Sequence, residues 1–467
     1  MKPIRKIRIS GADVFPIVEG GKGVGVSNGF TAGAFASANA VGTVSGTYPN
    51  LTVEQLDGPS VRRSEKTRQK RSLQLAADAI RESIAQARIA YEVSGGLGRI
   101  HMNILWGLAK AEMMVDGILD GAKGLIHGIT CGAGMPYKLA ELAGKYKTYF
   151  YPIVSSMRAF NILWTRSYNK FSHLLGGVVY EDPWLAGGHN GLSNKEDPRV
   201  PEDPYPRVAK LREFMNSVGL RETPVVMAGG VWNLKEYEHW FDNPEIGPVA
   251  FQLGTRPLLT KESPISDEWK QKLRALKKGD ILLNKFSPTS FYSSAIKNAF
   301  LSELYDRSTR QIEYREAPDA HFCEPLSLSS TRCTVYVEPD DWARSEAWKE
   351  QGFNFSIKTP DSTVLFLTKE KARQIQKDQS ECSGCLAGCR FSGWMDSEEH
   401  RYVTGIRPDA RSYCILKTLQ KVIQGVDVER ELMYSGSIGY RFAEDPFYAN
   451  GHTPTIQELV ERLLSGE

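Results

Sequence analysis

The sequence contains no apolar run long enough for a transmembrane helix, which takes about 20 residues. Its first residues are basic, but no apolar segment of the kind found in secretory signals follows them. Membrane insertion and export therefore lack support. We expect a cytoplasmic protein that does not contact a membrane.

Two further absences narrow the class of protein. Lys and Arg total 58 against 55 Asp and Glu, so the net charge of +3 gives no reason to expect a nucleic-acid partner. The 7 cysteines are odd in number and unevenly spread, unlike the framework of a secreted disulfide-rich protein. We expect free thiols or metal ligands.

Short apolar runs alternate with amphipathic segments in the first part of the chain. Between the second and third runs, residues such as Leu73, Ile80 and Tyr91 follow a helical period, which predicts a helix. Strands alternating with helices over about 250 residues are typical of a (β/α)₈ barrel. The runs predicted to be its strands are residues 14–18, 41–45, 100–105, 124–129, 149–154, 176–180, 224–228 and 248–253.

The pattern changes near Ser266. Residues 267–274 begin a helical stretch, and the remainder mixes helices with short strands such as 362–367. We therefore predict an α/β protein with a (β/α)₈ TIM barrel at residues 1–264. An additional α+β region at residues 265–467 is expected to complete or cap the barrel.

Glycine-rich segments follow the first, seventh and eighth predicted strands. Because glycine has no Cβ, backbone N–H groups can approach a flat ring or a phosphate closely there. Barrels that bind phosphorylated cofactors commonly hold the phosphate after their last two strands. These segments predict a cofactor site that includes Gly21, Gly23, Gly229, Gly230, Gly254 and Thr255.

A histidine between glycines follows the sixth predicted strand, in Ala186-Gly-Gly-His-Asn-Gly191. Alone, such a histidine fits a tight turn. Beside the glycine-rich strand ends, however, it stands where a barrel enzyme places an acid–base group. We predict that His189 is catalytic and that Gly188 contacts the cofactor.

Three cysteines, Cys382, Cys385 and Cys389, have C-x₂-C-x₃-C spacing on a glycine-containing loop. Thiolates at this spacing can hold an iron–sulfur cluster or a zinc ion. Cys414, Cys333 or Cys323 would supply a fourth ligand, and we take Cys414 as the first choice.

The motifs that carry a resemblance to a known family are 16–25, 102–103, 186–191, 224–231, 252–256 and 261–263, with 434–439 near the end of the chain. They resemble the FMN-dependent nitronate monooxygenases, once called 2-nitropropane dioxygenases, and the related FMN-dependent enoyl-acyl-carrier-protein reductases. The resemblance implies FMN as cofactor, with Asn103 at the flavin and His189 at the substrate. It implies phosphate binding by Gly229, Gly230, Gly254 and Thr255. The cysteine loop is also similar to the cluster loop of FMN barrel enzymes of the dienoyl-CoA reductase type.

The sequence departs from the family at two motif positions. Lys22 stands where the family has Met, and Leu185 stands where it has Glu. A lysine beside the flavin would stabilise an anionic reduced flavin or attract an anionic substrate, so we include Lys22 among the catalytic candidates. The alternative is a lysine that points to solvent.

Two reactions fit these residues, and both need a small-molecule or acyl-carrier substrate. In the first, which the family motifs favour, a nitronate or similar carbanion reduces FMN, O₂ reoxidises it, and His189 is the base. In the second, NAD(P)H or another donor supplies electrons, through the cysteine-bound cluster or directly, and an activated double bond is reduced with His189 as proton donor. Lys22 and the cysteine loop favour this second reaction.

Overall fold

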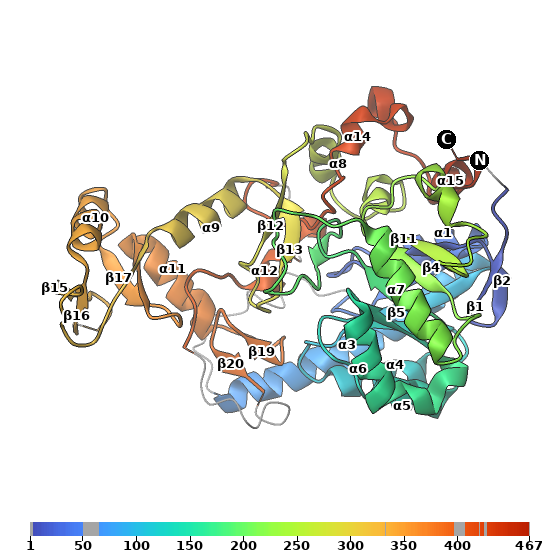
Figure 1. Ribbon diagram of the computed structural model, residues 1–467, viewed down its shortest axis with the longest axis horizontal. Coiled ribbons are helices and arrows are strands. Elements are labelled where there is room, and N and C mark those ends of the chain that lie inside the picture. Colours follow the sequence, from blue (N-terminus) through green and yellow to red (C-terminus); the bar gives the residue numbers. More distant parts are fainter. Residues whose placement is uncertain are drawn as a thin grey trace.

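The computed structural model describes residues 3–49, 65–331, 333–396, 407–419, 421–424 and 427–466 (Figure 1). Its centre is a closed barrel of parallel strands, in which the last strand pairs with the first. In barrel order the strands are β3 (Ile17–Glu19), β4 (Val41–Ser45), β5 (Arg99–Leu105), β6 (Gly128–Gly132), β7 (Tyr149–Val154), β8 (Val178–Glu181), β10 (Val225–Ala228) and β11 (Val249–Leu253). The predicted TIM barrel is confirmed.

Helices cover the outside of the barrel, so the strands are buried on both faces, as expected for parallel strands. Local sequence fixes where these helices begin: Asn28 forms a capping box, and Ser156 and Asp203 accept hydrogen bonds from first-turn N–H groups. The covering helices are α1 (Gly29–Ser37), α3 (Glu65–Ser94), α4 (Ala111–Gly121), α5 (Leu139–Tyr146), α6 (Met157–Arg166) and α7 (Pro204–Ser217), with 3₁₀ helices η1 (Tyr168–Leu174), η2 (Lys235–Trp240) and η3 (Arg256–Leu259).

Two predicted strands differ from the observed ones. Residues 14–18 divide into β2 (Ala12–Val14), which forms a hairpin with β1 (Ile7–Ile9), and β3 of the barrel. Pro16 lies between them and has no N–H group to continue a strand ladder. The run at 124–129 begins too early, because Gly124 has a φ of +81° and Ile126 still donates to Ala122 at the end of α4, so β6 starts at Gly128.

Some of the residues after β11 pack against the barrel, and others form a lobe that projects from it. β12 (Ile281–Asn284), β13 (Ser293–Ile296) and β9 (Gly188–His189) form a small sheet, so the C-terminal region pairs directly with a segment that follows β8. α15 (Ile456–Ser465) packs against α1, so the last helix of the chain returns to the first helix of the barrel. The boundary between residues 264 and 265 stays a prediction.

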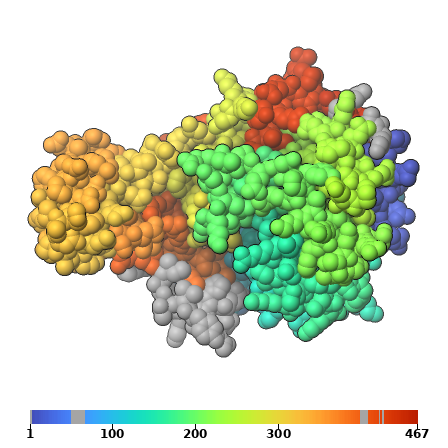
Figure 2. Space-filling model, viewed as in Figure 1, coloured from blue at the N-terminus to red at the C-terminus, as the bar shows by residue number. Residues whose placement is uncertain are grey.

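A separate lobe projects away from the barrel (Figure 2). A sheet of β14 (Gln311–Glu313), β18 (Thr363–Leu367) and β17 (Phe355–Lys358) supports it, beside the hairpin of β15 (Glu324–Ser327) and β16 (Thr334–Val337). Its helices are α9 (Ala299–Thr309), α10 (Pro339–Glu350) and α11 (Lys369–Ser380).

The remaining elements are α8 (Asp267–Arg274), β19 (Gly388–Cys389), β20 (Trp394–Met395), α12 (Ile415–Leu419), α13 (Lys421–Gln424), α14 (Arg441–Glu444) and η4 (Pro446–Gly451). Across the described ranges, none of the helices combines the length and apolar content that a membrane span requires.

Candidate functional site

A cavity of about 250 Å³ lies at the carboxyl ends of the barrel strands. It collects residues that follow seven of the barrel strands, together with residues of the C-terminal region. All of the predicted cofactor and catalytic residues line it: Gly21, Lys22, Gly23, Asn103, Gly188, His189, Gly229, Gly230, Gly254 and Thr255. The structure thus brings together groups that lie far apart in the sequence.

The glycines at this cavity let neighbouring groups come closer to the backbone than a Cβ atom would allow. A Cβ on Gly21 would lie 2.3 Å from the Cβ of Asn103, so only glycine lets the Asn103 side chain occupy its position. Asn103 is held there by a 3.0 Å hydrogen bond from Nδ2 to the hydroxyl of Thr130. A Cβ on Gly254 would meet no protein atom within 4 Å and would instead project into open space. These positions form a cradle with room for a ligand.

The C-terminal region completes the cradle beside Thr255. The N–H group of Gly436 donates to the hydroxyl oxygen of Thr255 at 2.8 Å, which leaves the Thr255 proton available to a further acceptor. Gly229 and Gly230 have φ values of +89° and +76°, which turn the chain sharply after β10. Backbone and hydroxyl donors of this kind suit a phosphate group.

His189 is held by contacts from the C-terminal region. Its backbone pairs with Ser293 of β13, and its Nε2 lies 2.6 Å from the hydroxyl oxygen of Ser287. The ring of Tyr434 meets it edge-on at 5.3 Å. Burial lowers the pKa of His189 to about 4, so the imidazole is neutral at pH 7 and can accept or share a proton.

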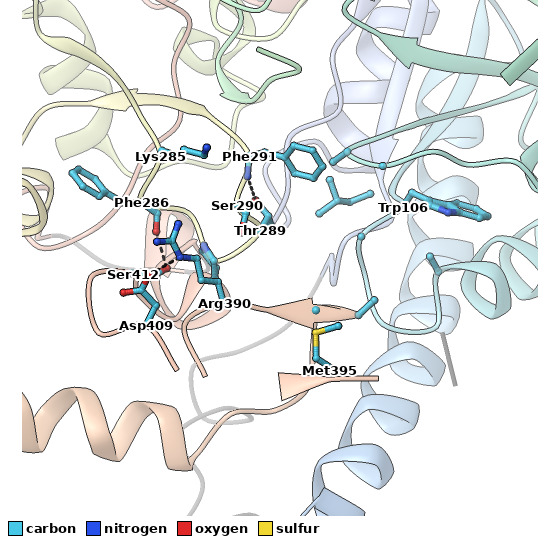
Figure 3. Close-up of a pocket in the computed structure, with 18 of the residues that line it drawn as sticks. Trp106, Lys285, Phe286, Thr289, Ser290, Phe291, Arg390, Met395, Asp409 and Ser412 are labelled. Atoms are coloured by element: carbon cyan, nitrogen blue, oxygen red, sulfur yellow. Dashed lines mark hydrogen bonds and ion pairs between the residues drawn. The ribbon is translucent and has the colours of Figure 1, made fainter. Parts of the chain in front are cut away.

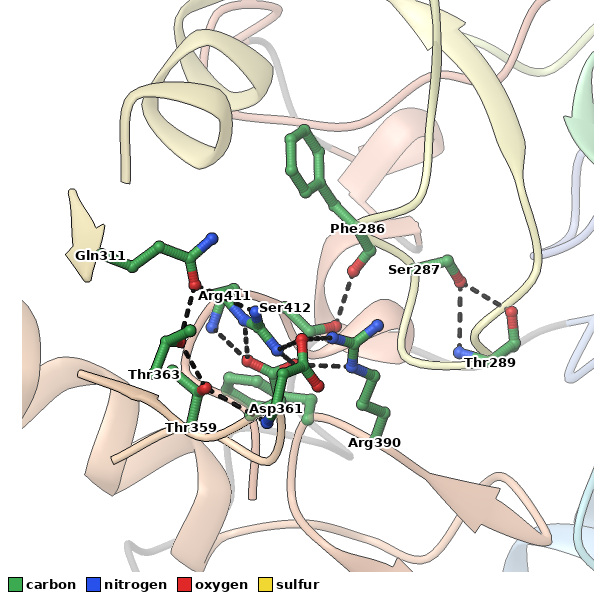
Figure 4. A network of polar contacts seen from close by, with 12 residues as sticks. Phe286, Ser287, Thr289, Gln311, Thr359, Asp361, Thr363, Arg390, Arg411 and Ser412 are labelled. Atoms are coloured by element: carbon green, nitrogen blue, oxygen red, sulfur yellow. Dashed lines mark hydrogen bonds and ion pairs between the residues drawn. The ribbon is translucent and has the colours of Figure 1, made fainter. Parts of the chain in front are cut away.

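The segment that carries Ser287 is held by a brace of polar residues that includes Ser412, Arg411 and Asp409. The hydroxyl of Ser412 donates to the Phe286 carbonyl at 2.7 Å (Figure 4). The neighbouring Arg411 forms a two-pronged pair with the fully buried Asp409 at 2.9 and 2.8 Å. Burial opposes ionisation of Asp409, but the Arg411 guanidinium holds the pKa of that carboxyl below its ordinary value. The brace therefore includes a buried ion pair in which the ionised form of Asp409 is favoured.

Lys22 points inward rather than to solvent. Its Nζ lies 2.9 Å from Oε1 of the fully buried Glu19 and also donates to the Gly20 carbonyl at 2.9 Å. Glu19 further accepts hydrogen bonds from the Ser27 hydroxyl at 2.9 Å and the Thr43 N–H at 3.1 Å. The positive charge at this edge of the cavity is thus neutralised within the protein.

The cysteines of the C-x₂-C-x₃-C loop lie together with Cys414. Cys389 donates a hydrogen bond to Cys382, which lowers the pKa of Cys382 to about 6, and the Ser392 hydroxyl also bonds to that sulfur at 3.1 Å. Cys385 lies within electrostatic reach of both Cys382 and Cys414. The other two candidates for a fourth ligand, Cys323 and Cys333, are exposed and belong to the projecting lobe.

The cysteine loop is docked on the barrel. The Cys385 carbonyl accepts hydrogen bonds from the Ala109 N–H at 3.0 Å and the Tyr48 hydroxyl at 2.9 Å, and Cys385 itself lines the cavity. No three His, Cys, Asp or Glu side chains in the described part of the chain are spaced to hold a metal ion. The four thiols are thus grouped without closing around one ion.

A second, larger cleft of about 1400 Å³ opens beside the cavity. Leu105 and Ala133 line both spaces, so the cleft adjoins the cofactor end of the barrel. Trp106 and Arg390 stand on opposite sides of it in Figure 3. Lys285 also lines the cleft, and its ammonium group is bonded to the Asn194 amide oxygen rather than to a carboxylate.

Sequence reasoning missed two residues of this site. Glu181 ends β8 and lines the cavity, and its position directly after the predicted strand 176–180 was a usable signal. Ser287 had no such signal, because its contact with His189 spans 98 residues of sequence.

The TIM barrel and a family match together indicate an FMN-dependent oxidoreductase. Residues 145–376 match the family model of nitronate monooxygenase, which confirms the resemblance seen in the motifs. The chain is therefore an enzyme of this kind, similar to nitronate monooxygenases.

Three solved structures illustrate the similarity. The enoyl reductase domain of MlnA from the macrolactin biosynthesis cluster of Bacillus amyloliquefaciens is 12% identical, with a TM-score of 0.54 over 97% of this chain and 93% of that one. FabK from Thermotoga maritima is 17% identical, with a TM-score of 0.44 over 63% of this chain and 74% of that one. Nitroalkane oxidase from Streptomyces ansochromogenes is 17% identical, with a TM-score of 0.43 over 62% and 78%. Comparison with curated protein sequences finds no match.

Proposed function

We propose that the protein reduces an activated carbon–carbon double bond with FMN, and that electrons enter through an iron–sulfur cluster held by Cys382, Cys385, Cys389 and Cys414. The observation that carries this proposal is the grouping of four thiols, one of which, Cys385, lines the cofactor cavity. The likeness over nearly the whole chain to an enoyl reductase domain agrees with it. NAD(P)H or another reductant is the ultimate donor.

The cradle suits FMN. The flavin ring would lie against Gly21, Gly23, Asn103 and Gly188. The phosphate would take the donors around Gly229, Gly230, Gly254 and Thr255, where a Cβ on Gly254 would point into open space. FMN supplies hydride transfer when bound. The protein's part is to exclude water and to place the substrate against the ring.

The proposed electron route needs a cluster rather than zinc, because zinc has no redox chemistry. Three of the thiols have the C-x₂-C-x₃-C spacing that can face an iron–sulfur cluster. Cys385 lies within electrostatic reach of Cys382 and Cys414. Burial among apolar residues shields such a group from water.

His189 orients the substrate in this scheme. Its neutral ring, fixed by Ser287, can share a hydrogen bond with a carbonyl or nitro oxygen conjugated to the double bond. Lys22 has its charge balanced by Glu19, so we assign it to holding the Gly20–Gly23 segment rather than to proton transfer.

The cleft of about 1400 Å³ is the proposed route for the substrate. Its apolar wall at Trp106 and Phe291 and the cation at Lys285 suit an extended substrate with an anionic end, such as an acyl carrier.

A second candidate is oxidation of a nitronate or similar carbanion by O₂, which the family match favours. His189, neutral at pH 7, would then take the proton from the acidic C–H bond of a neutral nitro compound.

Anaerobic purification tests the two proposals together. FMN, iron and sulfide are quantified, and turnover is measured on an α,β-unsaturated ketone under nitrogen and on a nitronate with O₂ uptake. We expect Cys385→Ser to lose iron and sulfide while keeping FMN, because a serine hydroxyl stays protonated and binds iron poorly. Cys333→Ser, at an exposed cysteine, is the matched control. Protein that never met air yet contains neither iron nor sulfide contradicts the reductase proposal and leaves nitronate oxidation in its place.

A further inference from the structure

Glu181 stands on the inner face of the barrel at the floor of the cofactor cavity. Side chains alternate along β8: Val178 and Tyr180 face the surrounding helices, whereas Val179 belongs to the barrel interior with Val226 of β10. Glu181 is two residues after Val179 on the strand, so its side chain is on the same, inner face of the barrel. It lines the cavity together with Asn103 and His189. Its register partner on β10 is Ala228, which is too small to cover it.

The carboxyl group of Glu181 has no hydrogen-bond partner within the part of the chain that the structure describes. Its neighbour Asp182 is turned away, because Oδ1 of Asp182 accepts hydrogen bonds from the N–H groups of Trp184 and Leu185 at 2.9 and 2.8 Å. Lys22 is the one cation in the described cavity lining, and its charge is taken by Glu19. A carboxylate placed here would therefore lack a counter-charge.

The neighbourhood disfavours the charged form of the half-buried Glu181. Burial, followed by the charge of Asp182, raises the pKa of Glu181 to about 8, while burial lowers the pKa of His189 to about 4. Two titratable groups in one cavity with pKa values pushed apart are the usual sign of divided acid and base roles. At pH 7 the carboxyl holds a proton and the imidazole does not. The other titratable groups on the cavity are Lys22, Tyr48, Cys385 and Tyr434.

We propose that Glu181 is the catalytic acid of this site, an assignment that rests on the proposed double-bond reduction. With a hydride that bound FMN would supply to one carbon of the double bond, the O–H bond of Glu181 would break and its proton would pass to the other carbon. Two C–H bonds form and the π bond is lost. Glu181 is left as a carboxylate and regains a proton from water before the next turnover.

The test compares Glu181→Gln with Glu181→Asp in the FMN-loaded protein. Gln keeps the size and cannot donate the proton at the same acidity, so we expect turnover on the unsaturated ketone to fall by a factor on the order of 100. Flavin reduction by the donor is expected to change less than about threefold. Asp, which keeps the acid but retracts it by one methylene, is expected to retain a pH-dependent rate at a reduced level.

Infrared spectroscopy supplies a readout that does not depend on turnover. The wild-type protein is expected to show a carboxylic-acid C=O band that disappears as pH rises through about 8, and Glu181→Gln is expected to lack this band. If the band is present but no double-bond substrate reacts, the proposed function fails while the protonated carboxyl stands. If no such band titrates above pH 7, or if Glu181→Gln retains the wild-type rate and pH profile, the assignment of Glu181 is overturned.

Discussion

The hydroxyl oxygen of Ser287 lies 2.6 Å from Nε2 of His189, joining a loop of the C-terminal region to the strand-end histidine of the barrel. Thr289 lies 2.9 Å from the same hydroxyl, and Ser412 anchors the adjacent Phe286 carbonyl. The ring of His189 therefore owes its orientation to residues outside the barrel. This arrangement makes the C-terminal region part of the cavity wall around His189.

Ser287→Ala is expected to lower kcat/KM by about tenfold with little change in FMN content. The substitution removes the hydrogen bond that fixes the imidazole. A misplaced imidazole orients the substrate less well, and a small misplacement of a positioning group can cost a large factor in rate. Steady-state kinetics and flavin absorbance check this. Ser193→Ala, at an exposed serine shortly after His189, is the matched control. Wild-type kinetics in Ser287→Ala would show that packing against Tyr434 alone orients the ring.

The sequence predicted the barrel because buried parallel strands leave continuous apolar runs, as at Val225–Ala228 and Val249–Leu253. It also predicted the glycine-rich strand ends, because they lie directly after such runs. His189 could be predicted because it stands between glycines in the segment that follows β8. It did not predict the contact of Ser287 with His189, since no periodic pattern relates residues on different elements. The ion pair of Lys22 with Glu19 was missed for another reason: a buried glutamate inside a strand leaves no mark in the apolar pattern.

The contribution of the buried histidines to the free energy of unfolding is expected to be lost as pH decreases from about 6.5 to 4. Burial lowers the pKa of His189 to about 4 and of His127 to about 4, so the unfolded chain binds protons in this range while the folded protein resists them. The stability contributed by each neutral histidine is complete above pH 6.5 and is lost toward pH 4, by at most about 3 kcal/mol per group.

Denaturant unfolding at a series of pH values measures this loss. His189→Gln is expected to show a shallower fall than the wild-type protein, because it has one fewer group to protonate. His452→Gln, at an exposed histidine, is expected to match the wild-type slope. Equal slopes in all three proteins would mean that His189 titrates at its ordinary pKa.

Gly254→Ala is expected to weaken FMN binding at least tenfold and to leave thermal stability unchanged. Its added Cβ meets no protein atom within 4 Å, so the fold has no clash to relieve, but the methyl group occupies space in the cofactor cradle. FMN affinity by fluorescence titration and the Tm of the apoprotein are the measurements. Gly107→Ala, whose Cβ would lie an ordinary 3.4 Å from the Ala133 carbonyl, is the control. Unchanged FMN affinity would place the cofactor elsewhere.

Lys22→Met is expected to destabilise the protein by about 3 kcal/mol, since it leaves the buried carboxylate of Glu19 without its counter-charge. A lysine that pointed to solvent would cost less than about 0.5 kcal/mol when replaced. Glu19→Gln combined with Lys22→Met is expected to recover a large part of the loss, because both charges are then removed together. Urea unfolding of the two single variants and the double variant gives the coupling between the residues. Additive effects in that cycle would contradict a direct ion pair, and the role of Lys22 at the cavity would have to be reassigned to the cofactor or the substrate.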